Sequence, residues 1–171
     1  RPQQITKNFL VLIPLFFTIN IWFNQEDISG VISIILKSLL AFGIAILITS
    51  AVYYLNDLLD INQDKNHPSK KNRPIAKGDI SVKLAIIITI ILITSSLTLS
   101  YTISYQMFLA TFTYLIINVF YSLYLKNIVI IDILCISASF VIRAIMGSIA
   151  IDYSIITIDE NQIELDLTIS P

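Results

Sequence analysis

The segment NDLLDINQDKNHPSKKNRPIAKGDIS, residues 56–81, separates two long apolar runs and concentrates much of the chain's charge. On an α-helix, at about 100° per residue, Asn56, Asp60 and Asp64 fall within about 80° of one another, and Asp57 lies at the edge of the same arc. Carboxylates gathered on one face repel each other unless a cation lies among them, and Mg²⁺ prefers such oxygen ligands together with substrate phosphates. The pattern therefore predicts a Mg²⁺ site, with a solvated mixed-charge loop as the alternative.

Composition indicates that this segment is attached to a membrane protein. The 171 residues are 56% hydrophobic and 13% charged, with a mean hydropathy of +0.80, whereas soluble domains are about 45–50% apolar and about 25% charged. Carboxylates next to membrane-spanning helices are costly and are often functional, which favours the site over the solvated loop. The net charge of −1 gives no reason to expect a nucleic-acid partner.

The apolar runs predict an all-α polytopic transmembrane helix bundle over residues 1–151. We expect about five spans, at residues 8–23, 30–59, 84–100, 107–124 and 128–151. Pro14 should kink the first of them. Lysine and arginine concentrate between the second and third spans, so we expect a multi-pass protein of the cell membrane with its active-site loops in the cytoplasm.

The C-terminal residues 152–171 form a divergent acidic tail by composition. IELDLTIS, residues 163–170, alternates apolar and polar side chains, and DENQ, residues 159–162, could turn an incoming YSIITI strand, residues 153–158, back onto it. The local pattern predicts a small β-hairpin.

The segment 56–81 resembles the first aspartate-rich motif of the UbiA-type intramembrane prenyltransferase superfamily, N-D-x-x-D-x-x-x-D followed by H-P-x-K-x-x-R-P-I-A-x-G. RPQQITKN at residues 1–8 and YSLYLKNIVIIDILCISASFVIRAIMGSIA at residues 121–150 resemble the polyprenyl-phosphate phosphoribosyltransferase branch, typified by decaprenyl-phosphate phosphoribosyltransferase. The resemblance covers about residues 1–150. Members of the superfamily continue into further spans, about nine in all, with a second polar motif, so this chain resembles an incomplete bundle of that type.

The resemblance implies Mg²⁺-dependent transfer of a 5-phosphoribosyl group from phosphoribosyl diphosphate to a polyprenyl phosphate in the membrane, with release of pyrophosphate. It implies that Asp57, Asp60 and Asp64 are the catalytic, metal-linked carboxylates. The expected substrate-binding residues are Asn56, Lys7, Asn8, Lys70, Arg73, Lys126, Asp132 and Arg143. Two alternatives stay open: attachment of a polyprenyl diphosphate to an aromatic acceptor, as in quinone or haem biosynthesis, and a truncated, non-catalytic membrane relative.

Several of these residues also have simpler explanations. Lys7 could anchor the chain at the membrane boundary, and Lys71 and Lys77 could serve membrane topology alone. Arg143 lies inside the fifth span and needs a partner, but Asp132 is about 16 Å away along the same helix. A structural interhelical role for Arg143 is therefore as reasonable as a ligand-binding role.

Overall fold

The computed structural model describes residues 6–125 and 128–158, and within these ranges the elements are helical. The four long helices are α4 (Ile28–Leu59), α7 (Val82–Ile103), α8 (Tyr105–Leu123) and α9 (Val129–Ile158). The short helices are η1 (Thr6–Leu12), α2 (Ile13–Phe17), α3 (Ile19–Trp22), α5 (Ile61–Asn66), η2 (Lys70–Asn72) and α6 (Pro74–Lys77).

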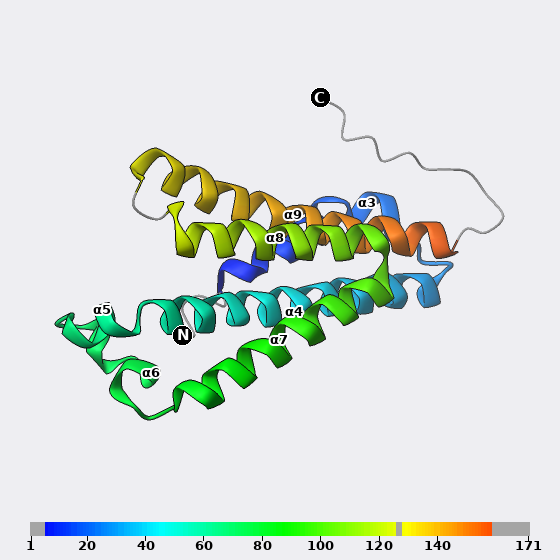
Figure 1. Cartoon of the computed structure of the whole chain (residues 1–171). Helices are drawn as coiled ribbons and strands as arrows, with labels where there is room; N and C mark the ends of the chain where they lie inside the picture. Colours follow the sequence, from blue (N-terminus) through cyan, green and yellow to red (C-terminus); the bar gives the residue numbers. More distant parts are fainter. Residues whose placement is uncertain (1–5, 126–127, 159–171) are drawn as a thin grey trace.

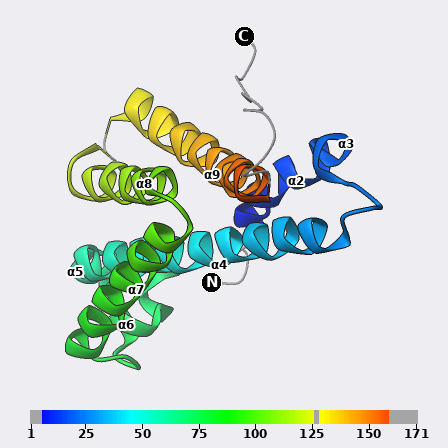
Figure 2. The same ribbon diagram turned by 90° about the vertical axis from the view of Figure 1, so that its right-hand side faces the viewer.

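The long helices pack as a bundle around α4, which contacts α7, α8, α9 and η1. The polar helices α5 and α6 lie at the same end of the bundle as the start of α7, the end of α8 and the start of α9 (Figure 1). Seen from the side, α9 lies between α8 and the α2–α3 segment (Figure 2). The α4–α7 connection and the α8–α9 connection therefore lie at the same end of the bundle.

Local capping explains where the long helices begin. The Asp27 carboxylate accepts a hydrogen bond from the Gly30 N–H (3.0 Å) at the start of α4, and the Ser81 hydroxyl accepts one from the Leu84 N–H (3.3 Å) at the start of α7. Ser104 ends α7 in an extended conformation and caps α8 by accepting from the Met107 N–H (3.0 Å). These side chains satisfy N–H groups that have no partner inside the helix.

Four of the five predicted spans are helices long and apolar enough to cross a membrane, namely α4, α7, α8 and residues 130–151 of α9. The first predicted span, residues 8–23, is not one continuous helix, because these residues form parts of three consecutive short helices. Pro14 lies in the first turn of α2. Proline has no backbone N–H to donate to the preceding turn, and its ring clashes with that turn, so a helix from residue 8 cannot continue regularly through it. The Thr18 hydroxyl donates to the Pro14 carbonyl (2.8 Å) where α2 ends.

The C-terminal end of α9 differs from the structure predicted there. Residues 153–158 continue α9 as helix, so the prediction that they form the first strand of a hairpin is wrong. The second predicted strand, residues 163–170, lies outside the described residues. The helix crosses position 151, and the division into a bundle over residues 1–151 and a separate tail stays a prediction.

The core between η1, α4 and α9 contains unusually close backbone contacts. Val11, Ala41, Ala45 and Met146 belong to one buried apolar cluster. At Gly147 of α9, a Cβ atom would collide with the Val11 carbonyl group of η1. Glycine therefore allows η1 to lie directly against α9, and this contact fixes the residues that η1 contributes to the site.

Candidate active site

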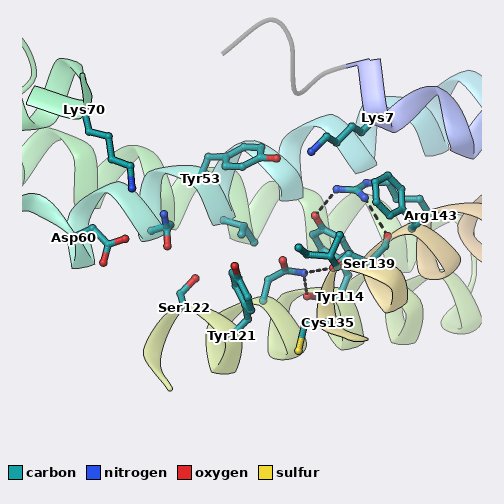
Figure 3. Close-up of a pocket in the computed structure, with 15 residues that line it drawn as sticks. Lys7, Tyr53, Asp60, Lys70, Tyr114, Tyr121, Ser122, Cys135, Ser139 and Arg143 are labelled. Atoms are coloured by element: carbon teal, nitrogen blue, oxygen red, sulfur yellow. Dashed lines mark hydrogen bonds between the residues drawn. The ribbon is translucent and has the colours of Figure 1, made fainter. Parts of the chain in front are cut away.

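A cavity of about 330 Å³ lies between α4, α8 and α9 and is also reached by side chains from η1 and η2. Figure 3 shows Asp60 and Lys70 at one end of it and Arg143, Tyr114 and Ser139 at the other. The described residues that line it are Lys7, Val52, Tyr53, Asn56, Asp60, Lys70, Tyr114, Asn118, Tyr121, Ser122, Cys135, Ile136, Ser139, Phe140 and Arg143. Among these, three are cations and one is a carboxylate, so the lining suits an anionic ligand.

The end of the cavity nearest the polar segment is formed where α4 stops. Asp60 is the C-cap of α4, and its N–H donates to the Asn56 carbonyl (3.0 Å). Both side chains line the cavity, together with Lys70 from η2. All three are site residues predicted from the sequence, and their side chains lie together at this end of the cavity.

Asp57 and Asp64, the other two aspartates of the motif, pair with Arg73 and do not line the cavity. The Arg73 Nη1 lies 3.1 Å from Asp57 Oδ1 and 2.6 Å from Asp64 Oδ2, and Asp64 has only 2% of its side chain exposed. None of these three residues lines the cavity. The cation expected among the carboxylates is thus supplied, for Asp57 and Asp64, by the chain's own arginine.

This arrangement tests how well the aspartates fit a metal ion. Among the described residues, no group of three His, Cys, Asp or Glu side chains is close enough together to hold one. Asp57, Asp60 and Asp64 therefore do not form a common three-carboxylate cage. Asp60 and Asn56 do fit a site of the kind in which Mg²⁺ takes one or two protein ligands and completes its shell with water and substrate phosphate.

The opposite end of the cavity is organised by Arg143, which is 4% exposed. Its Nε donates to Asn8 Oδ1 (3.0 Å), its Nη1 to the Ser139 carbonyl (3.1 Å) and its Nη2 to the Tyr114 hydroxyl (2.7 Å). The guanidinium also lies 5.1 Å from the centroid of the Tyr114 ring and 5.6 Å from that of Phe140. Within the described residues, every partner of this buried charge is neutral.

Asn8 connects three helices at this end. Its Oδ1 accepts from Arg143 of α9, and Thr49 Oγ1 of α4 lies 3.1 Å from the same oxygen. Asn8 is 1% exposed, and its Nδ2 has no hydrogen-bond partner among the described residues. Asn8 therefore supports Arg143 without lining the cavity, whereas the preceding residue, Lys7, does line it.

Two further predicted residues are not part of the described cavity. Asp132 does not line it, and one of its carboxylate oxygens is buried with no hydrogen-bond partner among the described residues. Lys126 lies outside the described residues, so its predicted role stays a prediction.

Tyr114, Asn118 and Ser139 were not among the predicted site residues, but all three line the cavity. Asn118 Nδ2 donates to the Tyr114 carbonyl (2.8 Å) and to Ser139 Oγ (3.2 Å), which joins α8 to α9 at the cavity wall. Tyr53 of α4 and Tyr121 of α8 also line the cavity. The available signal was the spacing of Tyr114, Asn118 and Tyr121, which places polar groups on one face of an apolar helix.

Comparisons with known proteins match this chain to a family and to individual relatives. The family model described as the UbiA prenyltransferase family matches residues 11–167. Decaprenyl-phosphate phosphoribosyltransferase of Mycobacterium tuberculosis is 31% identical over 88% of this chain and 48% of its own length. The enzyme of the same name from Corynebacterium glutamicum is 35% identical over 88% of this chain and 44% of its own length.

A solved structure has a similar fold. A chain from a structural study of digeranylgeranylglyceryl phosphate synthase in membranes superposes with a TM-score of 0.62 at 25% identity, covering 86% of this chain and 53% of that one. The present chain spans about half the length of these two named relatives and of the solved chain.

Proposed function

Since the chain belongs to the UbiA prenyltransferase family, we propose that it carries the substrate-binding cavity of a transferase that moves a 5-phosphoribosyl group from phosphoribosyl diphosphate to a polyprenyl phosphate. The observation that carries the proposal is the cavity itself, which is lined by Lys7, Lys70 and Arg143 and by the single carboxylate of Asp60 among its described residues. A donor with phosphate groups and an acceptor with a phosphate head are both anionic, and they complement this lining. The similarity to two decaprenyl-phosphate phosphoribosyltransferases supports the same reaction.

The reaction requires charge stabilisation more than proton transfer. A phosphate oxygen of the lipid attacks C1 of the ribose, the bond between C1 and the diphosphate oxygen breaks, and pyrophosphate leaves with the bonding electrons. Because the attacking oxygen is already anionic, no strong general base is needed, and catalysis rests on positioning and on neutralising the leaving group. In this proposal Lys70 interacts with the leaving pyrophosphate as a point charge.

Prenyltransferases of this family are typically metal-dependent. We propose that Asp60 and Asn56 hold Mg²⁺ together with the donor diphosphate, where the ion would neutralise charge on the leaving oxygens. In this proposal Asp57 and Asp64 serve the site indirectly, because Arg73 binds both of them.

Asp60→Asn tests the proposal. With phosphoribosyl diphosphate and a polyprenyl phosphate as substrates, we expect Mg²⁺-dependent pyrophosphate release to fall by about 100-fold or more, the order found when one electrostatic stabiliser is removed. Asp79→Asn is the matched control, because Asp79 is exposed and pairs with Lys77 outside the cavity. Unchanged turnover in Asp60→Asn would exclude the proposed role of this carboxylate.

A second candidate reaction is prenyl transfer from a polyprenyl diphosphate, and the similarity to the chain from the digeranylgeranylglyceryl phosphate synthase study favours it. The two reactions differ in which substrate carries the diphosphate. Purified protein should be given each donor and acceptor pair in turn, and pyrophosphate release with only the sugar donor supports the first reaction. Release with only a prenyl donor and an aromatic or alcohol acceptor supports the second reaction.

We propose that the protein is oriented in the cell membrane with the mouth of this cavity in the cytoplasm, where the water-soluble sugar donor is available. The concentration of lysine and arginine between α4 and α7 supports this orientation.

A further inference from the structure

The turn that presents Lys70 to the cavity is not held in place by buried side chains. Residues 65–72 are all exposed, and η2, which contains Lys70, packs against the short helices α5 and α6. The Lys70 side chain nevertheless points toward Asp60 in the cavity (Figure 3). A segment with few buried contacts depends on its local hydrogen bonds for a fixed position. The hydrogen bonds of this turn therefore determine where Lys70 lies.

His67 accepts several of these hydrogen bonds. Its Nδ1 accepts from the backbone N–H groups of Ser69 and Lys70, at 3.3 Å each, and the Ser69 hydroxyl lies at the same distance. The His67 carbonyl accepts from the Lys71 N–H (3.2 Å). Ser69 directly precedes η2, but its own side chain makes no capping hydrogen bond. His67 thus satisfies three successive N–H groups at the start of η2, as a capping residue does at a helix N-terminus.

The backbone of His67 holds its ring in position for this role. Its N–H donates to the Asp64 carbonyl at the end of α5 (3.2 Å), and its φ of −90° and ψ of 134° are the extended values favoured before a proline. Pro68 has no N–H, so Ser69 is the first residue after His67 that needs an acceptor. A backbone N–H can only donate, and Nδ1 therefore carries no proton. The ring connects the end of α5 to the start of η2.

We propose that His67 is a positioning residue for Lys70 and that it acts through Nδ1. This inference rests on the proposed function, in which Lys70 contacts the diphosphate of the donor. Lysine has a flexible stem, so the place from which its ammonium group enters the cavity is set by the backbone. His67 binds the backbone of Lys70 and not its side chain, which leaves the ammonium group available to the ligand.

Two polar substitutions test which ring atom matters. In His67→Asn the side-chain oxygen is bonded to Cγ, as Nδ1 is in histidine, and asparagine commonly accepts from the backbone N–H two residues on. In His67→Gln the acceptor lies one carbon further out and takes the place of Nε2. His67→Ala removes both acceptors. Restoration by asparagine and not by glutamine would therefore identify Nδ1.

The measurement is the binding of inorganic pyrophosphate with Mg²⁺ to the full chain in detergent, by calorimetry. We expect the affinity to fall by about 3- to 10-fold in His67→Ala and His67→Gln, as for loss of one or two hydrogen bonds. In His67→Asn it should stay within about twofold of the unmodified protein. Asn66→Ala is the matched control, because Asn66 is exposed beside His67 and its side chain donates to the Asn62 carbonyl (3.2 Å) within α5.

A double-mutant cycle separates the positioning of Lys70 from a general loss of structure. Lys70→Gln removes the charge that His67 positions, so His67→Ala should change the pyrophosphate affinity of Lys70→Gln by less than about twofold. Hydrogen exchange at the Ser69 and Lys70 amides should accelerate in His67→Ala and His67→Gln but not in His67→Asn. An undiminished effect of His67→Ala in the Lys70→Gln protein would overturn the inference, as would equal affinities of His67→Asn and His67→Ala.

The outcomes for His67 are distinct from those of the proposed function. Pyrophosphate affinities in the expected order support the positioning role even if phosphoribosyl transfer is never detected. Phosphoribosyl transfer together with one pyrophosphate affinity for all the His67 variants would overturn the positioning role and leave the proposed function standing. Absence of pyrophosphate binding to the unmodified protein would also overturn the positioning role, because Lys70 would then have no diphosphate to contact.

Discussion

Arg73 binds Asp57 and Asp64 through one nitrogen, and Asp64 is almost fully buried. Removing the arginine would leave a buried carboxylate without its cation, which is more costly than never having had the pair. We therefore expect Arg73→Gln to lower the free energy of unfolding by about 2–4 kcal/mol. Chemical denaturation in detergent micelles, followed by circular dichroism, measures this change.

A double variant tests whether the loss comes from the carboxylates. In Arg73→Gln combined with Asp64→Asn, the amide needs no counter-charge, so part of the lost stability should return. Lys71→Gln is the control, because Lys71 is exposed and its substitution removes the same charge from the same loop. Equal stability of Arg73→Gln and Lys71→Gln would contradict the pairing.

Asp27 gives the start of α4 a defined pH dependence. The Gly30 N–H and the Ser29 hydroxyl donate to its carboxylate, and these hydrogen bonds hold the pKa of Asp27 below the usual value of 3.8. Because the folded-state pKa is lowered, the stabilisation is fully present above the unfolded pKa and is lost as pH falls through the folded pKa. We expect hydrogen exchange at the Gly30 amide to accelerate below pH 3.8 relative to Asp27→Asn, whose cap does not titrate. Parallel exchange profiles for the two proteins would contradict this prediction.

The candidate site residues were predictable where the signal was local. Asn56, Asp60 and Lys70 belong to one continuous motif, and the structure brings their side chains to the same cavity. The partner of Arg143 was not predictable in this way, since Asn8 is 135 positions away in the sequence and only the packing of η1 on α9 brings them together. The pairing of Arg73 with Asp57 and Asp64 was missed because it depends on the path of an irregular loop, which periodicity does not describe.

At the scale of elements, the contact of η1 with α9 depends on Gly147. In Gly147→Ala the new methyl group would meet the Val11 carbonyl group, a backbone atom that cannot rotate away. We expect a loss of about 1–3 kcal/mol in the free energy of unfolding, as in other overpacked cores. The same change should shift η1 and therefore weaken the contact between Asn8 and Arg143.

Gly43 of α4 offers a matched control for this prediction. A Cβ atom there would have no neighbour within 4 Å, so Gly43→Ala adds a methyl group without a clash and removes the flexibility of a glycine inside a helix. We expect it to stabilise the protein by about 0.5–1 kcal/mol. Thermal unfolding of both variants in the same detergent measures the contrast, and similar losses in both would contradict the close contact at Gly147.

The helices were more predictable than their interruptions. The long apolar runs predicted α4, α7, α8 and α9 because burial in lipid requires every backbone group to be bonded within a helix. The first run was also apolar, but Pro14 and the Thr18 hydroxyl, which bonds back to the Pro14 carbonyl, divide it into short helices. Such local competition for backbone hydrogen bonds cannot be predicted from the composition of the segment.

For the whole molecule, the fold predicts which loops share a side of the membrane. Gln25 lies in the exposed connection before α4, and Asp79 lies in the exposed connection before α7, at the other end of α4 (Figure 1). In a Cys135→Ser background, we expect Gln25→Cys to react with a membrane-impermeant maleimide added to intact cells. Asp79→Cys should react only in inverted vesicles. Labelling of both positions from one side would contradict the proposed orientation.

The length of α4 has a consequence for the membrane that surrounds the protein. Its 32 residues extend for about 48 Å, whereas the hydrocarbon layer is about 30 Å thick. We propose that the excess projects at the C-terminal end of α4, so that Asn56 and Asp60 lie near the lipid headgroups and within reach of water. In that arrangement a thicker bilayer would draw these two polar side chains toward the acyl chains, and lipid thickness would then affect access to the cavity.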